Sequence, residues 1–567
     1  MASWADFPPE IRLLILEALL QDGCTVAELA TVSREWQAII EQHNFARIKI
    51  TKTKLPGFFL NTRRSRHLVK YIWLSLDLDV YSCCICNFHN PYNPFLSNSD
   101  AGNVLGPILK LLTWLKEWEP TGELVLDISV HSPSDSKHWL KYLTFEPDII
   151  PENGRSPGST TGSADIHVPE AHDWNVYQRF EEKKAILKTL DIIHIVDHDH
   201  EIDGSPCMWR LPEKMPTVPA VTGVLLRQQT RRQWHPRTLQ RILECFPNLQ
   251  DFVYEPWKRI GPERQKTANE EYASLFESLA LTKLRKLVIF EASNWYYKRL
   301  IRESLSMTLA ANSHGLREIS ASFLIEAASY FSYSTTGREW YHLQSLTLTS
   351  DLLSPREHPR QIDQLLTNAA KAARNMPALR TMELWNGRPG LAALFRYQRI
   401  YAAVIWRGTW NFTLRPAVVQ AWKDIAIKQG ARGLVVHTER LDCGPDIKSH
   451  GDAIHKLRLS KPVVRPISLH QIRTEHNVHC AWQESRKEQM RLLEVEYEDD
   501  DDWDDDDWED EDTNDEDWDE VDWDDMDWYH EYMDDEDWSH EDMDDEDMDD
   551  EDWDDEEREG DESEPEG

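Results

Sequence analysis

Five segments of this 567-residue chain share one pattern: a leucine, then two polar residues, then a strand of alternating apolar residues. The leading residues are Leu249, Leu284, Leu316, Leu343 and Leu379. Their spacings are 35, 32, 27 and 36 residues, and helical sequence fills the gaps, for example 267–281 and 361–375. This pattern predicts an α/β fold of leucine-rich-repeat type, with long, irregular units that stack into a parallel sheet with helices outside.

Further strands are expected on both sides of these five segments. Upstream, "LVKYIWLSLDL", "GELVLDISV" and "AVTGVLLRQQ" have the same character, and downstream "ARGLVVHTE" resembles them. Residues 455–467, "HKLRLSKPVVRPI", either continue the sheet or close it as a cap. The Gly-, Ser- and Pro-rich stretch 151–173 is expected to be a mobile surface insertion. The sequence therefore predicts one repeat domain over residues 51–490.

The first fifty residues predict three short helices. Pro8 and Pro9 stand where a helix can begin, and apolar residues follow at helical spacing. Thr25 is expected to cap a second helix, with Glu28 completing a capping box, and a third helix follows around Trp36. Three short helices with so much apolar surface cannot bury it among themselves, so a partner or a second domain must cover the rest.

Residues 1–50 resemble the F-box family, which links substrate receptors to the Skp-type adaptor of cullin ubiquitin ligases. The matching stretches are Phe7-Pro8-Pro9-Glu10-Ile11, Ile15-Leu16-Glu17-Ala18-Leu19 and Val32-Ser33-Arg34-Glu35-Trp36. Phe7 replaces the family's usual leucine, and Val26 stands where its second helix usually begins with leucine. The resemblance implies an adaptor-binding surface made of Phe7, Pro8, Ile11, Ile15, Leu19, Leu29, Val32 and Trp36.

Residues 50–490 also resemble a group of fungal F-box proteins, in stretches such as "DISVHSPSDSKHWLKYLTF" and "MELWNGRPGLAALFRYQ". That resemblance names no substrate.

The end of the chain, residues 491–567, is expected to be a disordered acidic tail. Residues 498–567 contain 46 acidic residues and one base, a net charge of −45, whereas residues 1–497 carry +6. Trp or Met occupies every fifth position from 503 to 553 except Thr513. At this spacing the side chains do not share one face of a helix, and they do not share one face of a strand either. The tail is either a polyanion with apolar anchors that binds basic proteins or an expanded repeat that solvates the chain.

Three groups of residues have the composition of a chemical site. Cys83, Cys86 and His89 have the spacing of a partial zinc site, but reduced structural thiols are the better explanation. Two clusters of His and Asp are either metal ligands or polar loops. They are His194, Asp197, His198, Asp199 and His200, and then His450, Asp452 and His455. A group of arginines around Trp234 is either a solvated loop or a site for phosphate, for an acidic peptide or for the tail. It consists of Arg227, Arg231, Arg232 and Arg237.

No phosphate loop, nucleophile elbow or kinase motif is present in the sequence, so no enzyme activity and no cofactor are expected. The slightly basic charge of the body does not predict nucleic-acid binding, and no apolar run is long enough for a membrane span. The sequence thus predicts a cytoplasmic or nuclear substrate-recognition subunit of a Skp-cullin-F-box ubiquitin ligase. The alternatives are a non-ligase interaction scaffold and, with less support, a hydrolase or metal enzyme that uses the His clusters.

Overall fold

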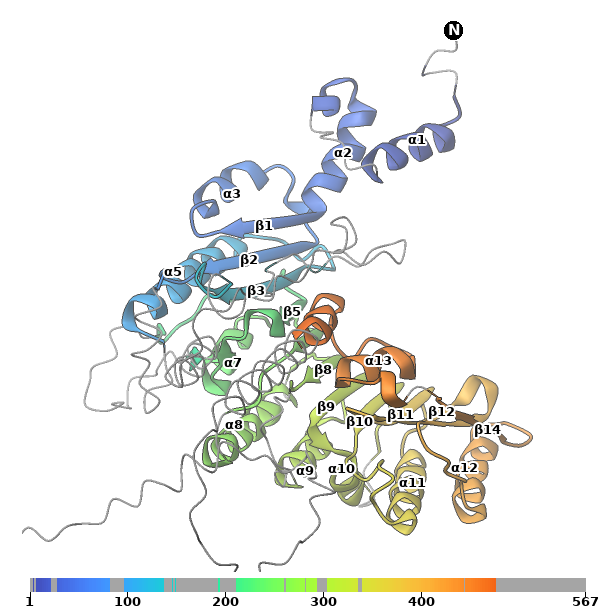
Figure 1. The fold of residues 1–567 in the computed structure, drawn as a ribbon. Helices are drawn as coiled ribbons and strands as arrows, with labels where there is room; N and C mark the ends of the chain where they lie inside the picture. The colour runs from blue at the N-terminus through green and yellow to red at the C-terminus, as the bar shows by residue number, and fades with distance from the viewer. Residues whose placement is uncertain are drawn as a thin grey trace, which may run out of the picture. The chain divides into compact units, whose positions relative to one another are not determined.

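The structure is a computed structural model that describes residues 4, 7–21, 28–81, 96–136, 145, 148, 192–193, 211–259, 262–280, 282–292, 303–334, 339–442 and 444–475. The chain divides into two units, Met1–Trp503 and Asp504–Gly567, and every described residue belongs to the first (Figure 1). The expected insertion 151–173 and the acidic tail 491–567 lie outside the described residues.

One large, mostly parallel sheet organises the described residues. Its strands follow one another in chain order, and only the pairs β11–β12 and β12–β13 are antiparallel. The strands are β1 (Arg47–Thr51), β2 (Tyr71–Asp77), β3 (Val125–His131), β5 (Gly223–Leu226), β7 (Asp251–Tyr254), β8 (Lys286–Phe290), β9 (Glu318–Glu326), β10 (Ser345–Thr349), β11 (Thr381–Arg388), β12 (Leu391–Gln398), β13 (Ala403–Gly408) and β14 (Val435–Arg440). A separate pair joins β4 (Ile192–Ile193) to β6 (Gln233–Trp234).

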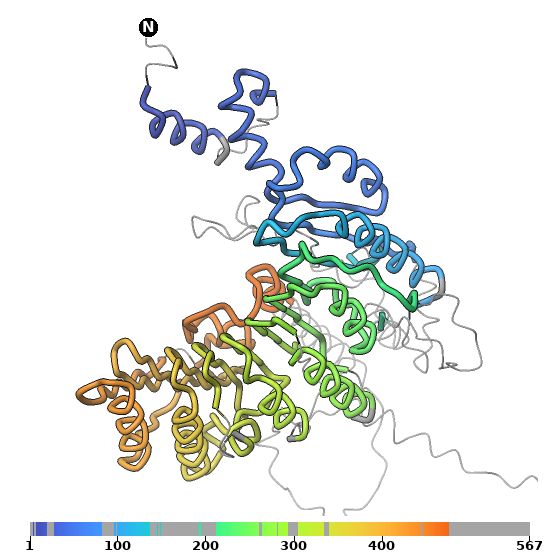
Figure 2. Tube along the Cα trace, turned by 180° about the vertical axis from the view of Figure 1, so that it is seen from behind, coloured from blue at the N-terminus to red at the C-terminus, as the bar shows by residue number. Residues whose placement is uncertain are grey.

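Helices cover one face of this sheet, as Figures 1 and 2 show. They are α3 (Leu55–Thr62), α5 (Asn98–Leu115), α7 (Pro236–Leu243), α8 (Pro262–Ala280), α9 (Glu303–Asn312), α10 (Ala327–Ser334), α11 (Pro359–Ala373) and α12 (Pro416–Lys428). Helices α7, α11 and α12 each begin at a proline, whose missing N–H costs nothing in the first turn. Helix α11 buries Ile362, Leu365, Leu366 and Ala369, spaced three or four residues apart, in the core that it shares with the strands.

The leading leucines occupy equivalent places in successive units, as the sequence predicts. In four of the five units the leucine amide donates to the carbonyl three residues earlier, so that Leu316 bonds Ser313 and Leu343 bonds Trp340, both at 3.1–3.4 Å. The strands start in step, because Lys286 is paired with Glu318, Glu318 with Ser345, and Ser345 with Thr381. All five leucines are buried in the core between sheet and helices. The predicted α/β architecture of parallel strands with outer helices is therefore confirmed.

The opposite face of the sheet, here called the inner face, is covered in part by residues 444–475, here called the closing segment. It contains α13 (His450–Leu457) and a helix over residues 466–475. A second hydrophobic core joins Trp257, Phe290 and Trp385 of the sheet side to Leu457 and Ile472 of the closing segment. Residues 455–467 thus form no strand. They lie on the inner face. Leu457, Val463 and Val464 pack in the second core, and the backbone amides of Ser460 and Arg465 donate to Glu383 and Glu255.

The N-terminal region contains α1 (Pro9–Gln21), a 3₁₀ turn η2 (Glu28–Thr31) and α2 (Arg34–Ala46). The expected second helix is only this single turn in the described residues, and its predicted cap Thr25 lies outside them. The turn ends early because the Ser33 hydroxyl accepts the Trp36 amide at 3.3 Å and starts α2. Helix α2 then leads directly into β1, so the sheet begins at Arg47, inside the predicted 1–50 region.

Candidate functional site

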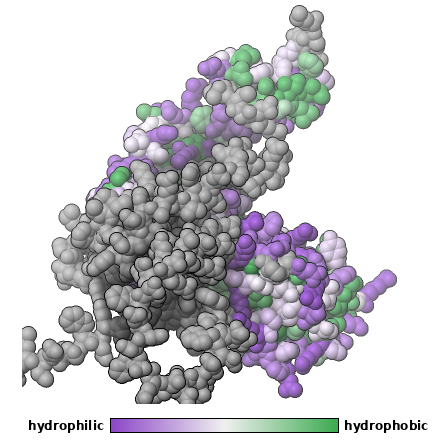
Figure 3. Space-filling model, in the orientation of Figure 1, coloured by the Kyte–Doolittle hydropathy of each residue, from purple (hydrophilic) through white to green (hydrophobic). Residues whose placement is uncertain are grey.

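Hydrophobic side chains occupy most positions of α1, while Glu10 and Glu17 share one side of the helix. Of those described, Leu16 is only 1% exposed, while Ile11, Leu13, Leu14 and Ile15 are 37–58% exposed. Figure 3 shows this hydrophobic surface at the N-terminal end of the molecule. A contiguous patch of large exposed apolar side chains commonly marks a site where a partner binds. The exposed surface of α1 is therefore a candidate docking site.

A small set of contacts fixes α1 against α2. The Arg12 guanidinium lies 3.0 Å from the Glu35 carboxylate, and the same carboxylate accepts the Trp4 indole N–H at 3.2 Å. The Trp4 and Trp36 rings lie 5.1 Å apart. These polar and aromatic contacts and the buried Leu16 hold the helix, while Ile11, Leu13, Leu14 and Ile15 stay exposed.

The residues that the F-box resemblance assigns to adaptor binding divide into two groups. Five are exposed, namely Phe7, Pro8, Ile11, Ile15 and Val32. Three are half-buried, namely Leu19, Leu29 and Trp36. The sequence reasoning left Leu13 and Leu14 out of the site, although both are exposed. The signal for them was the run of four consecutive apolar residues at 13–16.

The arginines around Trp234 form neither the solvated loop nor the site for phosphate, peptide or tail that the sequence left open, which corrects both expectations. Arg227, Arg231 and Arg232 are 1–5% exposed and paired inside the protein. Arg227 binds Asp127 at 2.8 Å with both side chains fully buried, Arg231 binds Glu475 at 2.9 Å, and Arg232 binds Asp135 at 3.1 Å. Arg237 alone is exposed, and Trp234 is buried. Each buried guanidinium is therefore paired with a carboxylate, as a buried charge requires, and the carboxylate of Glu475 belongs to residues 444–475.

Two buried carboxylates of the sheet side hold the closing segment on the inner face. Glu255 accepts the backbone amide of Arg465 and the hydroxyl of Ser468, as well as the Gln228 amide at 3.1 Å. Glu383 accepts the amide and the hydroxyl of Ser460 at 3.0 and 2.9 Å. Burial raises the pKa of Glu255, and these hydrogen bonds oppose that rise. The closing segment is thus an integral part of the fold.

The remaining candidate clusters give no chemical site in the described residues. Asp452 bonds Ser449 at the start of α13 and pairs with Arg473 at 2.8 Å, and His450 packs near the Phe290 and Phe323 rings. No group of three or more possible metal ligands occurs in the described part of the chain. The weak zinc candidates Cys83, Cys86 and His89 lie outside it, as does the cluster from His194 to His200.

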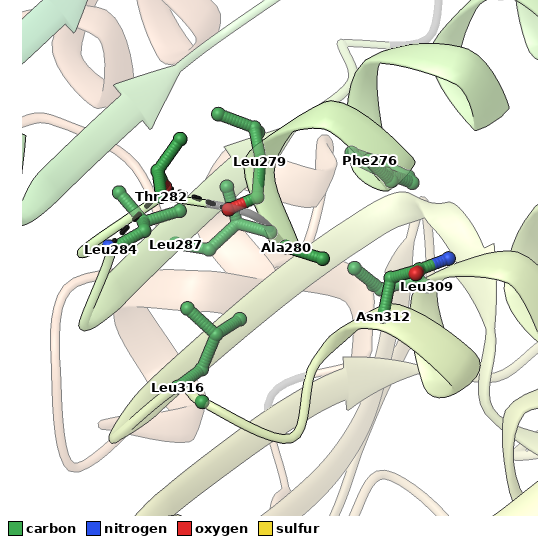
Figure 4. Close-up of a pocket in the computed structure, with 10 residues that line it drawn as sticks. Phe276, Leu279, Ala280, Thr282, Leu284, Leu287, Leu309, Asn312 and Leu316 are labelled. Atoms are coloured by element: carbon green, nitrogen blue, oxygen red, sulfur yellow. Dashed lines mark hydrogen bonds between the residues drawn. The ribbon is translucent and has the colours of Figure 1, made fainter. Parts of the chain in front are cut away.

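A small cavity lies between α8 and α9 on the helix side of the sheet (Figure 4). Its volume is about 30 Å³, and Leu279, Leu284 and Leu316 are among the residues that line it. Ligand pockets are about ten or more times larger, so this is a packing gap between two units. None of the helices in the described ranges combines the length and apolar character needed to cross a bilayer.

The fold defines a mixed α/β protein with one large, mostly parallel sheet, an inner face partly covered by the closing segment and an N-terminal helix with exposed apolar side chains. A family of unknown function, DUF6546, matches residues 246–465 of the chain. The match starts at the first of the five leucine segments and ends within the closing segment. A search of curated proteins finds no match.

Proposed function

We propose that this protein is a substrate-recognition subunit of a Skp-cullin-F-box type ubiquitin ligase. The N-terminal helices are its F-box and bind the Skp-type adaptor, and through it a cullin. The leucine-rich-repeat-like domain holds a protein substrate. The subunit performs no bond chemistry. It acts by raising the local concentration of substrate lysines near the conjugating enzyme, in the cytoplasm or the nucleus.

The exposed surface of α1 is the observation that supports this proposal. Ile11 and Ile15 lie one helical turn apart on that surface, and Phe7 and Pro8 precede them. Large apolar side chains that are exposed in the free protein and flanked by polar contacts are typical anchors of an interface, where a few residues carry most of the binding energy. The Arg12–Glu35 pair keeps the helix oriented before a partner arrives, which lowers the entropy cost of binding.

The test is co-purification of the Skp-type adaptor with the full chain and with the double variant Pro8→Ala, Ile15→Ala. Truncation of an interface anchor costs about 2 kcal/mol or more, so two anchors weaken binding by roughly a thousandfold. Both residues are exposed, so the variant keeps its fold, and circular dichroism checks this.

A matched control is the double variant Ile400→Ala, Tyr401→Ala, whose side chains are 83% and 67% exposed elsewhere on the protein. This control retains the adaptor if α1 is the docking site. A wild-type chain that fails to retain the adaptor at micromolar concentration disproves the F-box assignment. A chain that binds the adaptor but supports no ubiquitination of any captured protein is a scaffold instead.

A further inference from the structure

One stretch of the fold, residues 47–70, carries bases and no acids. It comprises β1, α3 and the 3₁₀ turn η3 (Arg66–Leu68) and is here called the basic unit. Its eight bases are Arg47, Lys49, Lys52, Lys54, Arg63, Arg64, Arg66 and Lys70, and all eight are exposed. Residues 1–497 have a net charge of +6, so the rest of that region sums to −2 without this unit. The excess positive charge of the body is therefore concentrated on one unit.

The core fixes the positions of these charges. Leu55, Phe58 and Val69 of the basic unit are buried in the main hydrophobic core. On β1, the Arg47 guanidinium lies 4.1 Å from the centre of the Tyr71 ring, and the Lys49 ammonium lies 3.9 Å from that of Trp73. The basic unit is thus a rigid scaffold that displays its charges before any partner binds.

The described carboxylates of the protein make no ion pair with this surface. Within the described residues, none of the eight bases lies within 4 Å of a carboxylate in an ion pair. Instead, Lys52 donates to the Asn103 side-chain oxygen at 2.6 Å, Arg66 to the Glu117 backbone carbonyl at 3.2 Å and Arg47 to the Asp148 backbone carbonyl at 2.6 Å. Neutral oxygens leave the positive charge available to an external anion.

Protection of a free sheet edge explains only part of this pattern. Strand β1 is an edge strand of the sheet in the described residues, and charged residues on such a strand discourage unwanted strand pairing. Arg47 and Lys49 lie on this edge strand. The other six bases lie on α3's flanking turns, on η3 and before β2, where they protect no strand edge. Six exposed bases therefore call for another explanation.

We propose that the basic unit binds an acidic segment of a partner protein. A polyanionic peptide matches the charge, and the 74% exposed Leu60 offers a contact for an apolar side chain among its acids. Nucleic acid matches the unit less well. Phe58 is buried and Phe59 packs on Trp114 with rings 5.3 Å apart, so the unit shows no free aromatic platform for base stacking.

The experiment measures binding of a fluorescent 20-residue peptide, made of Glu and Asp with Leu at every fifth position, to the full chain at low salt. Reversing three bases of the basic unit weakens binding at least tenfold, and salt weakens binding to the wild type. This variant carries Arg63→Glu, Arg64→Glu and Arg66→Glu. A control with the same change in net charge, placed elsewhere, leaves binding within twofold. It carries Lys423→Glu, Arg432→Glu and Lys448→Glu, all at exposed positions.

Four results overturn the proposal. The first is an absence of peptide binding by the wild type, and the second is an equal loss in both triple variants, which reduces the effect to net charge. The third is tighter binding of a 20-nucleotide single strand that is sensitive to the same three arginines. The fourth is carbodiimide cross-linking of Lys52 or Lys54 to residues 498–567 of the chain itself. The adaptor-defective variant Pro8→Ala, Ile15→Ala still binds the peptide, so this proposal and the proposed function fail independently.

Discussion

Replacing Leu343 by alanine tests the structural equivalence of the five leucine segments. The Leu343 side chain is fully buried in the core between the sheet and the outer helices. Its backbone amide bonds the Trp340 carbonyl, and the following residue, Gln344, donates to the Arg317 carbonyl of the preceding unit at 2.8 Å. The substitution leaves this backbone pattern intact, so it measures only what the side chain contributes.

The expected loss of stability follows from burial. Leu→Ala removes three carbon groups, worth about 0.8 kcal/mol each, or about 2.4 kcal/mol in total. The cavity that remains adds a further cost, and measured values in well-packed cores reach about 5 kcal/mol. Leu343 is completely enclosed, so we expect a loss of about 3–4 kcal/mol. Leu316 lines an existing cavity of about 30 Å³, so we expect Leu316→Ala to lower the free energy of unfolding by about 2.4 kcal/mol, the burial contribution alone.

The assay is guanidinium denaturation followed by far-UV circular dichroism, which is insensitive to the many tryptophans of the acidic tail. Arg317→Ala is the matched control, because Arg317 is exposed and adjoins Leu316. We expect this control to change the free energy of unfolding by less than about 0.5 kcal/mol. If Leu343→Ala and Leu316→Ala both unfold at the same denaturant concentration as this control, the assigned register is wrong.

Two further predictions concern buried charged and titratable groups. Asp127→Asn strips the buried Arg227 of its charge partner and should cost about 3–5 kcal/mol in thermal or chemical unfolding, whereas breaking the exposed pair of Arg440 with Asp442→Asn should cost under about 1 kcal/mol. Burial lowers the pKa of His131 from 6.5 to about 4, despite Asp77 at 3.4 Å. The unfolded chain therefore takes up this proton before the folded chain does, and stability falls by up to about 3 kcal/mol as pH drops from 6.5 to 4. His131→Asn should flatten this part of the pH–stability curve, and an unchanged slope would contradict the assignment.

The sequence contains enough local information to predict the strands and outer helices. In four of the five segments a tight turn precedes the leading leucine, and the apolar residues after the polar pair enter the sheet. The pattern is local, since in four of the five segments the leucine amide bonds a carbonyl only three residues away. The same reasoning could have found the antiparallel β11–β12 hairpin, because Asn386-Gly387 and Pro389-Gly390 stand between two apolar runs and Gly390 has a φ of 70°.

The inner face could not be predicted in this way. Its contacts join residues that are far apart in the chain, such as Glu255 with Ser468 and Asp148 with Arg465. In the sequence, a buried arginine and a solvated one look alike, so the cluster from Arg227 to Arg232 had the composition of a surface site. Only the partners Asp127, Asp135 and Glu475 distinguish the two cases, and no spacing rule connects them. Exposure of α1 was predictable because its apolar excess is a property of the helix alone.

The closing segment restricts where a partner can bind this protein. Trp257, Phe290 and Trp385 on the inner face are at most 5% exposed, because residues of the closing segment cover them. A partner that used this face would have to break the buried bonds of Glu255 and Glu383, at a cost of several kcal/mol. Recognition is therefore expected on surfaces that the fold does not need for stability, such as α1 and the basic unit. Substitutions there change binding while leaving the folded state almost unaffected, which makes these two surfaces separable by mutation.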